Sequence, residues 1–180
     1  AIQQGIQSAV PVAVSCAAAG IIVGIVNLTG LGVKFSSSLI SLSNGSIPIA
    51  LFLTMIAAII LGCGLPTTAV YIILASLAAP ALVQMGVSAL AAHLFVFYFG
   101  CISTITPPVA LTSYAAAGIG EANPSKTGLK AFFYGIAAYI VPFMFVFSPA
   151  LLLKDSLPNT IMGLLSALFG IFVLSTSIAG

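Results

Sequence analysis

Threonine and serine hydroxyls gather at two places in this sequence where glycine or proline interrupts an apolar run. The first is Gly62-Cys-Gly-Leu-Pro-Thr-Thr68, and the second is Ser103-Thr-Ile-Thr-Pro-Pro108. Hydroxyl oxygens, together with carbonyl oxygens left free at a helix end, can act as ligands for a dehydrated cation. Backbone N–H groups at a helix start carry the positive end of the helix dipole and suit a carboxylate. Each break could therefore hold a cation and an anion without a charged side chain.

The expected ligand atoms follow from where each helix should stop and restart. Carbonyls without intrahelical partners are expected at Ile60, Leu61, Gly62 and Ile102. Free N–H groups are expected near Thr67–Ala69 and Val109–Ala110. Proline lacks an N–H and disfavours the helical conformation in the residue before it. The helix before the second break should thus end near Ile102 and restart with a proline in its first turn.

His93 is the other chemistry-bearing side chain of the apolar region. An ionisable residue inside a membrane suggests a function, here a proton relay. The competing interpretation is a neutral histidine near the interface, hydrogen-bonded to backbone or to a lipid headgroup. An intramembrane enzyme using His93 with Ser103 or Cys101 is a further alternative. His93 and Cys101 would lie about 12 Å apart along one helix at 1.5 Å rise per residue. No nucleophile–base pair or phosphate-binding loop is recognisable, so we expect no enzyme.

The elements that must position these groups lie in a membrane. Charged residues make up 3% of the chain, apolar types 61%, and the mean hydropathy is +1.31. Soluble domains carry about 25% charged residues, whereas here none lies between Lys34 and Glu121. The net charge of +2 is too small for a nucleic-acid patch. The three cysteines lack metal-ligand spacing and are interpreted as packing residues. The sequence predicts an all-α polytopic membrane protein.

Apolar lengths divide the chain, taken as one transmembrane domain over 1–180, into five predicted segments. A spanning helix needs about 20 apolar residues. The segments are spans at 9–33, 129–153 and 158–179, a hairpin at 47–83, and a discontinuous span at 88–119. Exposed connectors are expected at 34–46 and 120–128, and kinks at Pro142 and Pro149.

The segment 47–83 has two short apolar legs, 47–61 and 69–83, around the first break. This spacing favours a re-entrant hairpin over one long bent span. Unwound backbone at membrane depth must line a cavity or face other protein, because lipid offers no hydrogen bonds. Two interrupted helices in one bundle indicate a transport site. Kinks repaired by Ser or Thr side chains are the structural alternative.

Several longer motifs occur in a recognisable order. They are Cys16-Ala-Ala-Ala-Gly-Ile-Ile-Val-Gly24, Leu28-Thr-Gly-Leu-Gly32, Gly62-Cys-Gly-Leu-Pro-Thr-Thr-Ala-Val-Tyr-Ile-Ile73, Ala91-Ala-His-Leu-Phe-Val-Phe-Tyr-Phe-Gly100 and Ile105-Thr-Pro-Pro-Val-Ala110. Together they resemble the large permease subunit of TRAP (tripartite ATP-independent periplasmic) transporters, and the residues of these motifs are most similar to those of the TAXI-type branch. The resemblance runs from about residue 9 to 170. One departure is Gly64-Leu65-Pro66 at the hairpin tip, where many members have an aspartate.

The resemblance implies an elevator-type fold of two inverted repeats, of which this chain would be the second, C-terminal repeat. The hairpin tip and the broken helix would then form a sodium site and a carboxylate site. The implied sodium ligands are Gly62, Gly64, Thr67, Ser103, Thr104 and Thr106. The implied substrate residues are Thr68, Pro107, Pro108 and Val109.

The implied function is part of a sodium-coupled symport that imports organic acids (carboxylates) across a bacterial or archaeal inner membrane. A periplasmic substrate-binding protein would deliver the substrate. A small membrane subunit or its fused equivalent, and the first repeat of the same permease, would complete the machine. Sodium would act as the coupling ion, and no cofactor or nucleic acid is expected. The alternatives are another class of secondary transporter or channel, and a structural membrane subunit with kinked helices.

Overall fold

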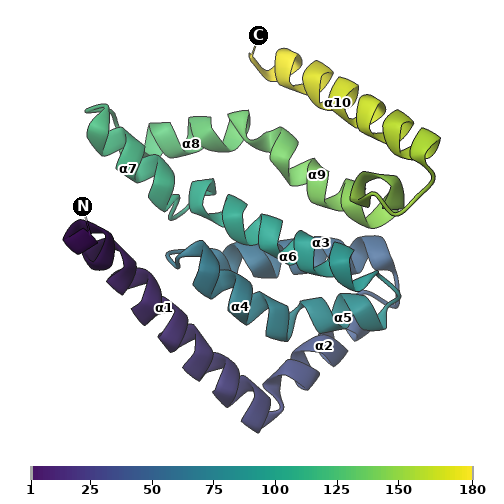
Figure 1. Cartoon of the computed structure of the whole chain (residues 1–180), viewed down its shortest axis with the longest axis horizontal. Coiled ribbons are helices and arrows are strands. Elements are labelled where there is room, and N and C mark those ends of the chain that lie inside the picture. Colours follow the sequence, from purple (N-terminus) through teal and green to yellow (C-terminus); the bar gives the residue numbers. More distant parts are fainter. Residues whose placement is uncertain (1, 180) are drawn as a thin grey trace. The chain divides into compact units, whose positions relative to one another are not determined.

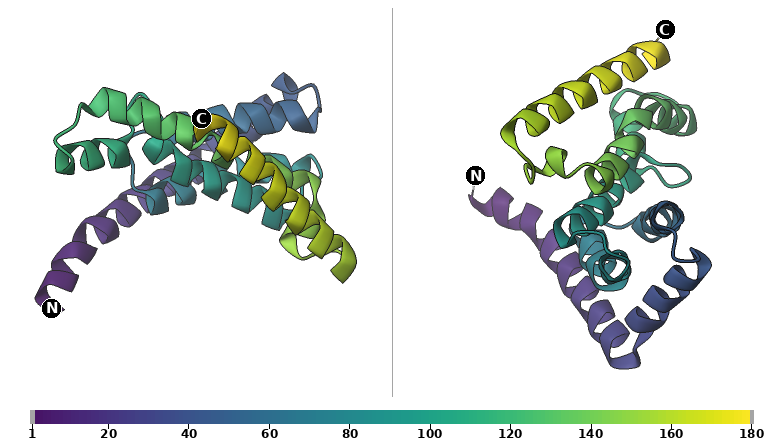
Figure 2. Two further views of the ribbon diagram at one scale, coloured as in Figure 1. Left: turned by 90° about the horizontal axis from the view of Figure 1, so that it is seen from above. Right: turned by 90° about the vertical axis from the view of Figure 1, so that its right-hand side faces the viewer.

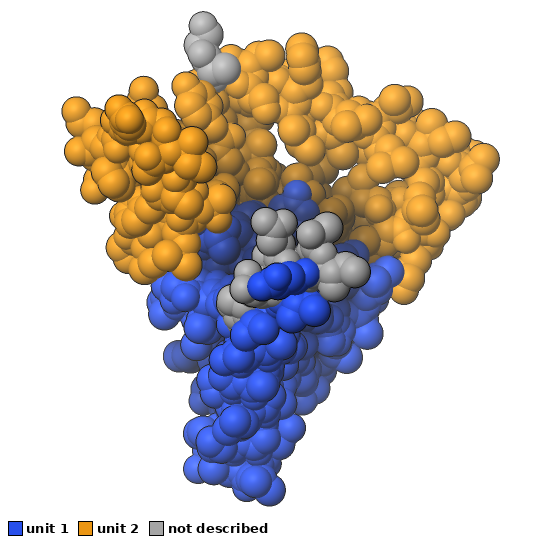
Figure 3. All heavy atoms as spheres, turned by 60° about the vertical axis from the view of Figure 1, so that its left-hand side comes forward, with its two compact units in different colours: residues 1–104 blue, residues 105–180 orange. Residues whose placement is uncertain are grey.

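The computed structural model describes the backbone of residues 2–179; side chains at positions 2, 4, 5, 7, 8, 11, 12 and 179 are not described. The described backbone is built of helices and contains no strand, as predicted for an all-α protein. Packing divides the chain into two compact units, residues 1–104 and 105–180, coloured separately in Figure 3. Each unit is described by itself below.

The first unit consists of six α-helices, labelled in Figure 1. They are α1 (Ile2–Thr29), α2 (Leu31–Leu42), α3 (Ile47–Gly62), α4 (Thr67–Leu77), α5 (Ala79–Gln84) and α6 (Ala89–Ile102). A short 3₁₀ turn, Ser103–Ile105, follows α6. The core lies where α6 packs against α3, α4 and α5. Phe95 and Phe99 of α6 are fully buried there, with ring centroids 4.8 Å apart.

A sharp bend separates α1 from α2 at Gly30, where the helix axis turns by 76°. Gly30 has φ +68°, a left-handed conformation that glycine adopts without steric cost. Figure 1 and the right-hand view of Figure 2 both show the bend. The bend falls inside the predicted span 9–33.

The connector expected at 34–46 is wrong for most of its length, because α2 runs through it to Leu42. Ser36 and Leu39 are buried, and the Ser36 hydroxyl donates to the carbonyl of Leu77 at 3.3 Å. Packing against α4 and α5 stabilises a serine-rich helix that has little intrinsic propensity. Local composition alone could not reveal this packing.

Helices α3 and α4 run antiparallel as two legs of a hairpin and contact each other (Figure 1). The outer ends of the hairpin lie close together, since the Ser43 hydroxyl is 3.9 Å from the sulfur of Met85. Both legs pack against α6. The second leg, α4 followed by α5, is longer than the predicted 69–83 leg and extends over Thr67–Gln84.

The second unit contains four α-helices, namely α7 (Leu111–Ile119), α8 (Pro124–Tyr134), α9 (Ile136–Phe147) and α10 (Leu157–Ala179), and a 3₁₀ turn at Pro149–Leu152. Asn123 caps α8 by accepting a hydrogen bond from the Lys126 N–H at 3.1 Å. Pro142 lies inside α9, and the chain leaves the α-helix before Pro149. The predicted span 129–153 thus falls on α8, α9 and that 3₁₀ turn.

Three described helical segments are long and apolar enough to cross a membrane: Thr67–Gln84, Pro124–Phe147 and Leu157–Ile178. A fourth results if the bent pair Ala13–Thr29 and Leu31–Leu42 counts as one span. The helices Ile47–Gly62 and Ala89–Ile105 are apolar but shorter. These lengths support a polytopic membrane protein.

Candidate functional site

The first helix break lies between α3 and α4. Helix α3 ends at Gly62, and α4 begins at Thr67 after an extended Pro66. Gly64 adopts φ +82°, which turns the chain back on itself. The predicted interruption at 62–68 is therefore present.

The second break begins as predicted, because α6 ends at Ile102. The expected restart with a proline in the first helical turn is wrong: α7 begins at Leu111, after Ala110 with φ +38°. Pro107 and Pro108 disfavour the helical conformation at the residues before them, which delays the restart. The free N–H groups expected at Val109–Ala110 therefore belong to the first turn of α7 instead.

The ends of α3 and α6 meet within the first unit. The Ser103 hydroxyl lies 2.8 Å from the carbonyl oxygen of Gly100 and 3.3 Å from that of Gly62. The Gly62 carbonyl also accepts from the Leu65 N–H at 3.4 Å. Both distances to the Gly62 oxygen are at the long end of the hydrogen-bond range, so this oxygen is only weakly engaged. The structure thus brings together the oxygen atoms of two predicted cation ligands, Gly62 and Ser103.

Two hydroxyls at the end of α6 direct their protons back into the helix. Ser103 donates to Gly100, and Thr104 donates to the Cys101 carbonyl at 2.8 Å. A hydroxyl has one proton and two lone pairs, so a hydroxyl that donates to its own helix keeps acceptor capacity for another group. Ser103 is 1% exposed and Thr104 is half-buried. These contacts also satisfy carbonyls at the end of α6, as a structural cap would.

The start of α4 offers donors rather than acceptors. No described side chain caps this helix at Pro66. The N–H groups of Thr67, Thr68 and Ala69 belong to the first turn and have no partner within the helix. Thr67 is half-buried and Thr68 is exposed. The tip of the hairpin can therefore donate to an anion.

Thr106 belongs to the second unit and is 6% exposed. Its hydroxyl is hydrogen-bonded to the hydroxyl of Tyr139 on α9. Tyr139 was not among the residues indicated by the sequence. The apolar segment 129–153 contains two tyrosines, Tyr134 and Tyr139, and the partner of Tyr139 lies 33 positions away, which a local pattern does not reveal.

The proline turn itself is anchored within the second unit. The Tyr114 hydroxyl donates to the Pro108 carbonyl at 2.8 Å, and the peptide bond between Pro107 and Pro108 is cis. Pro107 and Val109 are half-buried, and Pro108 is exposed. In the first turn of α7, Ser113 is buried, and its hydroxyl has no hydrogen-bond partner among the described residues.

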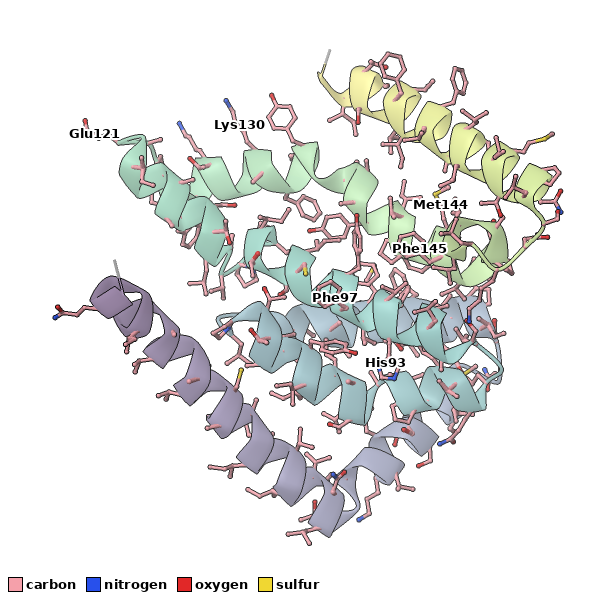
Figure 4. The ribbon with its side chains drawn as sticks, viewed as in Figure 1. His93, Phe97, Glu121, Lys130, Met144 and Phe145 are labelled. Carbon is pink, nitrogen blue, oxygen red and sulfur yellow. The ribbon has the colours of Figure 1, made fainter. Side chains whose placement is uncertain are left out.

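His93 lies on α6 with Phe97 one turn further along, and both are labelled in Figure 4. Its Nδ1 is 3.1 Å from the hydroxyl of Tyr71 on α4, and the Tyr71 ring meets Phe97 edge-on at 5.6 Å. This tyrosine side chain is a partner of His93 that the sequence did not indicate. Among the described residues, no three His, Cys, Asp or Glu side chains are placed to hold a metal ion.

The family model for the tripartite ATP-independent periplasmic transporter, DctM component, matches residues 1–160. Neither a search of curated proteins nor one of solved structures found a match. The matched family is one of transporters, which disfavours the intramembrane-enzyme interpretation of His93. This match covers most of the chain, and it agrees with the apolar helices long enough to cross a membrane. The chain therefore belongs to the DctM component family of tripartite ATP-independent periplasmic transporters.

Proposed function

We propose that this chain is part of a permease that couples sodium entry to the import of organic acids. The family establishes a secondary-transporter permease. The observation that carries the finer proposal is the meeting of the Gly62 carbonyl and the Ser103 hydroxyl, 3.3 Å apart, at the ends of two interrupted helices. Helix breaks of this kind are where membrane transporters hold ions and substrates.

A monovalent cation suits the proposed ligands better than a divalent one. The residues proposed to supply oxygen ligands to the cation are Gly62, Gly64, Thr67, Ser103, Thr104 and Thr106. All are carbonyl or hydroxyl oxygens, and no acidic residue lies between Lys34 and Glu121. Calcium and magnesium sites use carboxylates to offset the cost of dehydrating a doubly charged ion. A set of uncharged oxygen ligands therefore supports sodium as the bound cation.

The substrate carboxylate is proposed to bind at the helix starts, beginning with Thr68 at the hairpin tip. Among the residues first assigned to this role, Pro107 and Pro108 have no N–H to donate. They and Val109 would shape the turn, while the N–H groups of the first α7 turn, Leu111 to Ser113, would face the anion. The buried Ser113 hydroxyl, unpartnered among the described residues, supports a polar ligand there.

The remaining parts of the proposal are those that the resemblance of the sequence implies, and membership of the DctM component family supports them at the level of a permease complex. A periplasmic substrate-binding protein delivers the organic acid, and a small membrane subunit or its fused equivalent completes the complex. The chain acts as the second repeat of an elevator-type permease of the TAXI-type branch, in a bacterial or archaeal inner membrane. In this arrangement 47–83 is a re-entrant hairpin and 88–119 a discontinuous span.

The test is organic-acid uptake by the full-length permease complex and its binding protein in proteoliposomes. An inward sodium gradient should drive accumulation above the external concentration, and choline in place of sodium should abolish it. Uptake that is equal with choline would contradict sodium coupling. Equilibration without accumulation would indicate a channel.

A further inference from the structure

We propose that Tyr139 is a positioning residue that turns the Thr106 hydroxyl so that its oxygen can bind the coupling cation. This inference rests on the proposed function, in which Thr106 is a sodium ligand. It assigns a role to a residue of α9 that the two helix breaks do not contain.

The contact joins two segments of the second unit. The Tyr139 hydroxyl is hydrogen-bonded to that of Thr106, which is 6% exposed. The Tyr139 ring is packed edge-on against Phe132 of α8, with ring centroids 5.3 Å apart. A tyrosine ring has two side-chain torsions, so packing of this kind holds its hydroxyl in place at little entropic cost.

Close packing at the junction of α8 and α9 brings Tyr139 to this position. A Cβ atom added at Gly135 would lie 3.0 Å from the Ile105 side chain, so the junction lies directly against the segment that carries Thr106. Tyr139 is four residues after Gly135 and on the same face of the helical chain. The Tyr139 ring therefore lies one helical turn beyond the contact between Gly135 and Ile105, and beside Thr106.

The Thr106 hydroxyl needs a hydrogen-bond acceptor for its proton if its oxygen is to bind a cation. A hydroxyl that binds a cation through a lone pair must direct its proton away from the cation. Away from bulk water, the protein must accept that proton. Carbonyls of α6 do so for Ser103 and Thr104. The Tyr139 oxygen, hydrogen-bonded to the Thr106 hydroxyl, can accept the Thr106 proton in the same way.

The test compares sodium titrations of uptake by the full permease complex with its binding protein. Tyr139→Phe should raise the half-saturating sodium concentration about fivefold, which corresponds to about 1 kcal/mol. Its maximal rate at saturating sodium should stay near that of the wild type. The matched control is Tyr134→Phe, which removes the same atom from a ring that is 66% exposed. This control should leave the titration unchanged.

Combining Tyr139→Phe with Thr106→Val distinguishes a Tyr139 that positions Thr106 from a Tyr139 that only stabilises the fold. Because Tyr139 acts through Thr106, Tyr139→Phe should add little to Thr106→Val, giving a non-additive cycle. Sodium-dependent thermal stabilisation of the purified complex provides the same titration without transport. There too the midpoint for Tyr139→Phe should shift about fivefold.

The outcomes distinguish the two levels of the proposal. Wild-type uptake that ignores sodium would overturn the proposed function and this inference with it. A sodium-dependent wild type with an unshifted Tyr139→Phe titration would overturn the inference alone. So would additive effects in the double variant, or a lower maximal rate without any change in sodium half-saturation.

Discussion

At the residue scale, a missing side chain at Gly62 allows the ends of α3 and α6 to meet. A Cβ atom there would lie 2.6 Å from the Cβ of Ser103 and 3.4 Å from Val70. Real Cβ atoms do not approach a neighbour as closely as 2.6 Å, so a larger residue must push the two helix ends apart. The distance between the Gly62 carbonyl and the Ser103 hydroxyl therefore depends on glycine at this position.

Gly62→Ala should destabilise the permease by about 1–3 kcal/mol, the usual cost of overpacking. The measurement is thermal or denaturant unfolding of the full-length protein in detergent. Gly20→Ala is the matched control, because it adds the same methyl group where no described atom lies within 4 Å. Alanine in place of glycine inside a helix is neutral or stabilising. Equal stability of the two variants would contradict the close approach.

Ser103→Ala should raise the half-saturating sodium concentration several-fold in the proteoliposome assay. It removes one proposed oxygen ligand and the hydrogen bond to the Gly100 carbonyl. Ser37→Ala serves as the comparison, since that hydroxyl is exposed and donates locally to the Lys34 carbonyl at 3.0 Å. A titration of Ser103→Ala that overlays the wild type would remove Ser103 from the site.

At the element scale, each helix end is determined by a few local atoms. Asp155 precedes α10, accepts a hydrogen bond from the Ser156 N–H at 2.6 Å and binds the Asn159 amide at 3.1 Å. The backbone bond first and the Asn159 bond second hold the pKa of this exposed carboxyl below its usual value. A negative charge at a helix start is also favoured by the helix dipole.

This arrangement predicts a pH dependence for the start of α10. The folded-state pKa of Asp155 is lower than the unfolded one, so the unfolded chain binds more protons as the pH falls. The stabilisation is present at neutral pH and is lost as the pH falls below about 4, through the folded-state pKa. Amide exchange of Ser156 to Thr160 should accelerate at low pH relative to Asp155→Asn, corrected for intrinsic rates. Identical pH profiles for both proteins would contradict this role.

At the scale of the whole molecule, the bilayer replaces water as the solvent for much of the surface. In α10, Met162, Leu165, Leu168, Phe169 and Phe172 are each between 63% and 73% exposed. A patch of this kind would aggregate in water, whereas lipid tails cover it at no cost. The described surface therefore agrees with the membrane-spanning length of Leu157–Ile178.

Phe169→Arg should make the free energy of membrane insertion of α10 less favourable by about 2.5–3.5 kcal/mol, because the position is near the middle of the helix. Asn159→Arg, near its start, should cost much less because the long side chain can reach the interface. A glycosylation reporter fused to the full chain measures the inserted fraction. Equal insertion of the two variants would contradict a spanning α10.

The sequence by itself determined the solvent, the fold class and the two helix breaks. The absence of charge from Lys34 to Glu121 requires a membrane, and Gly62–Thr68 and Ser103–Pro108 interrupt helices by effects that reach only a few residues. Local rules therefore predicted the end of α6 at Ile102.

Only the tertiary structure decided what those breaks face. It extended helix through α2, and it joined Gly62 to Ser103 and Thr106 to Tyr139. Each of these contacts joins residues more than 30 positions apart, with separations of 41 and 33. Such pairs depend on how whole helices pack, and packing is a property of surfaces that no local pattern of residues contains.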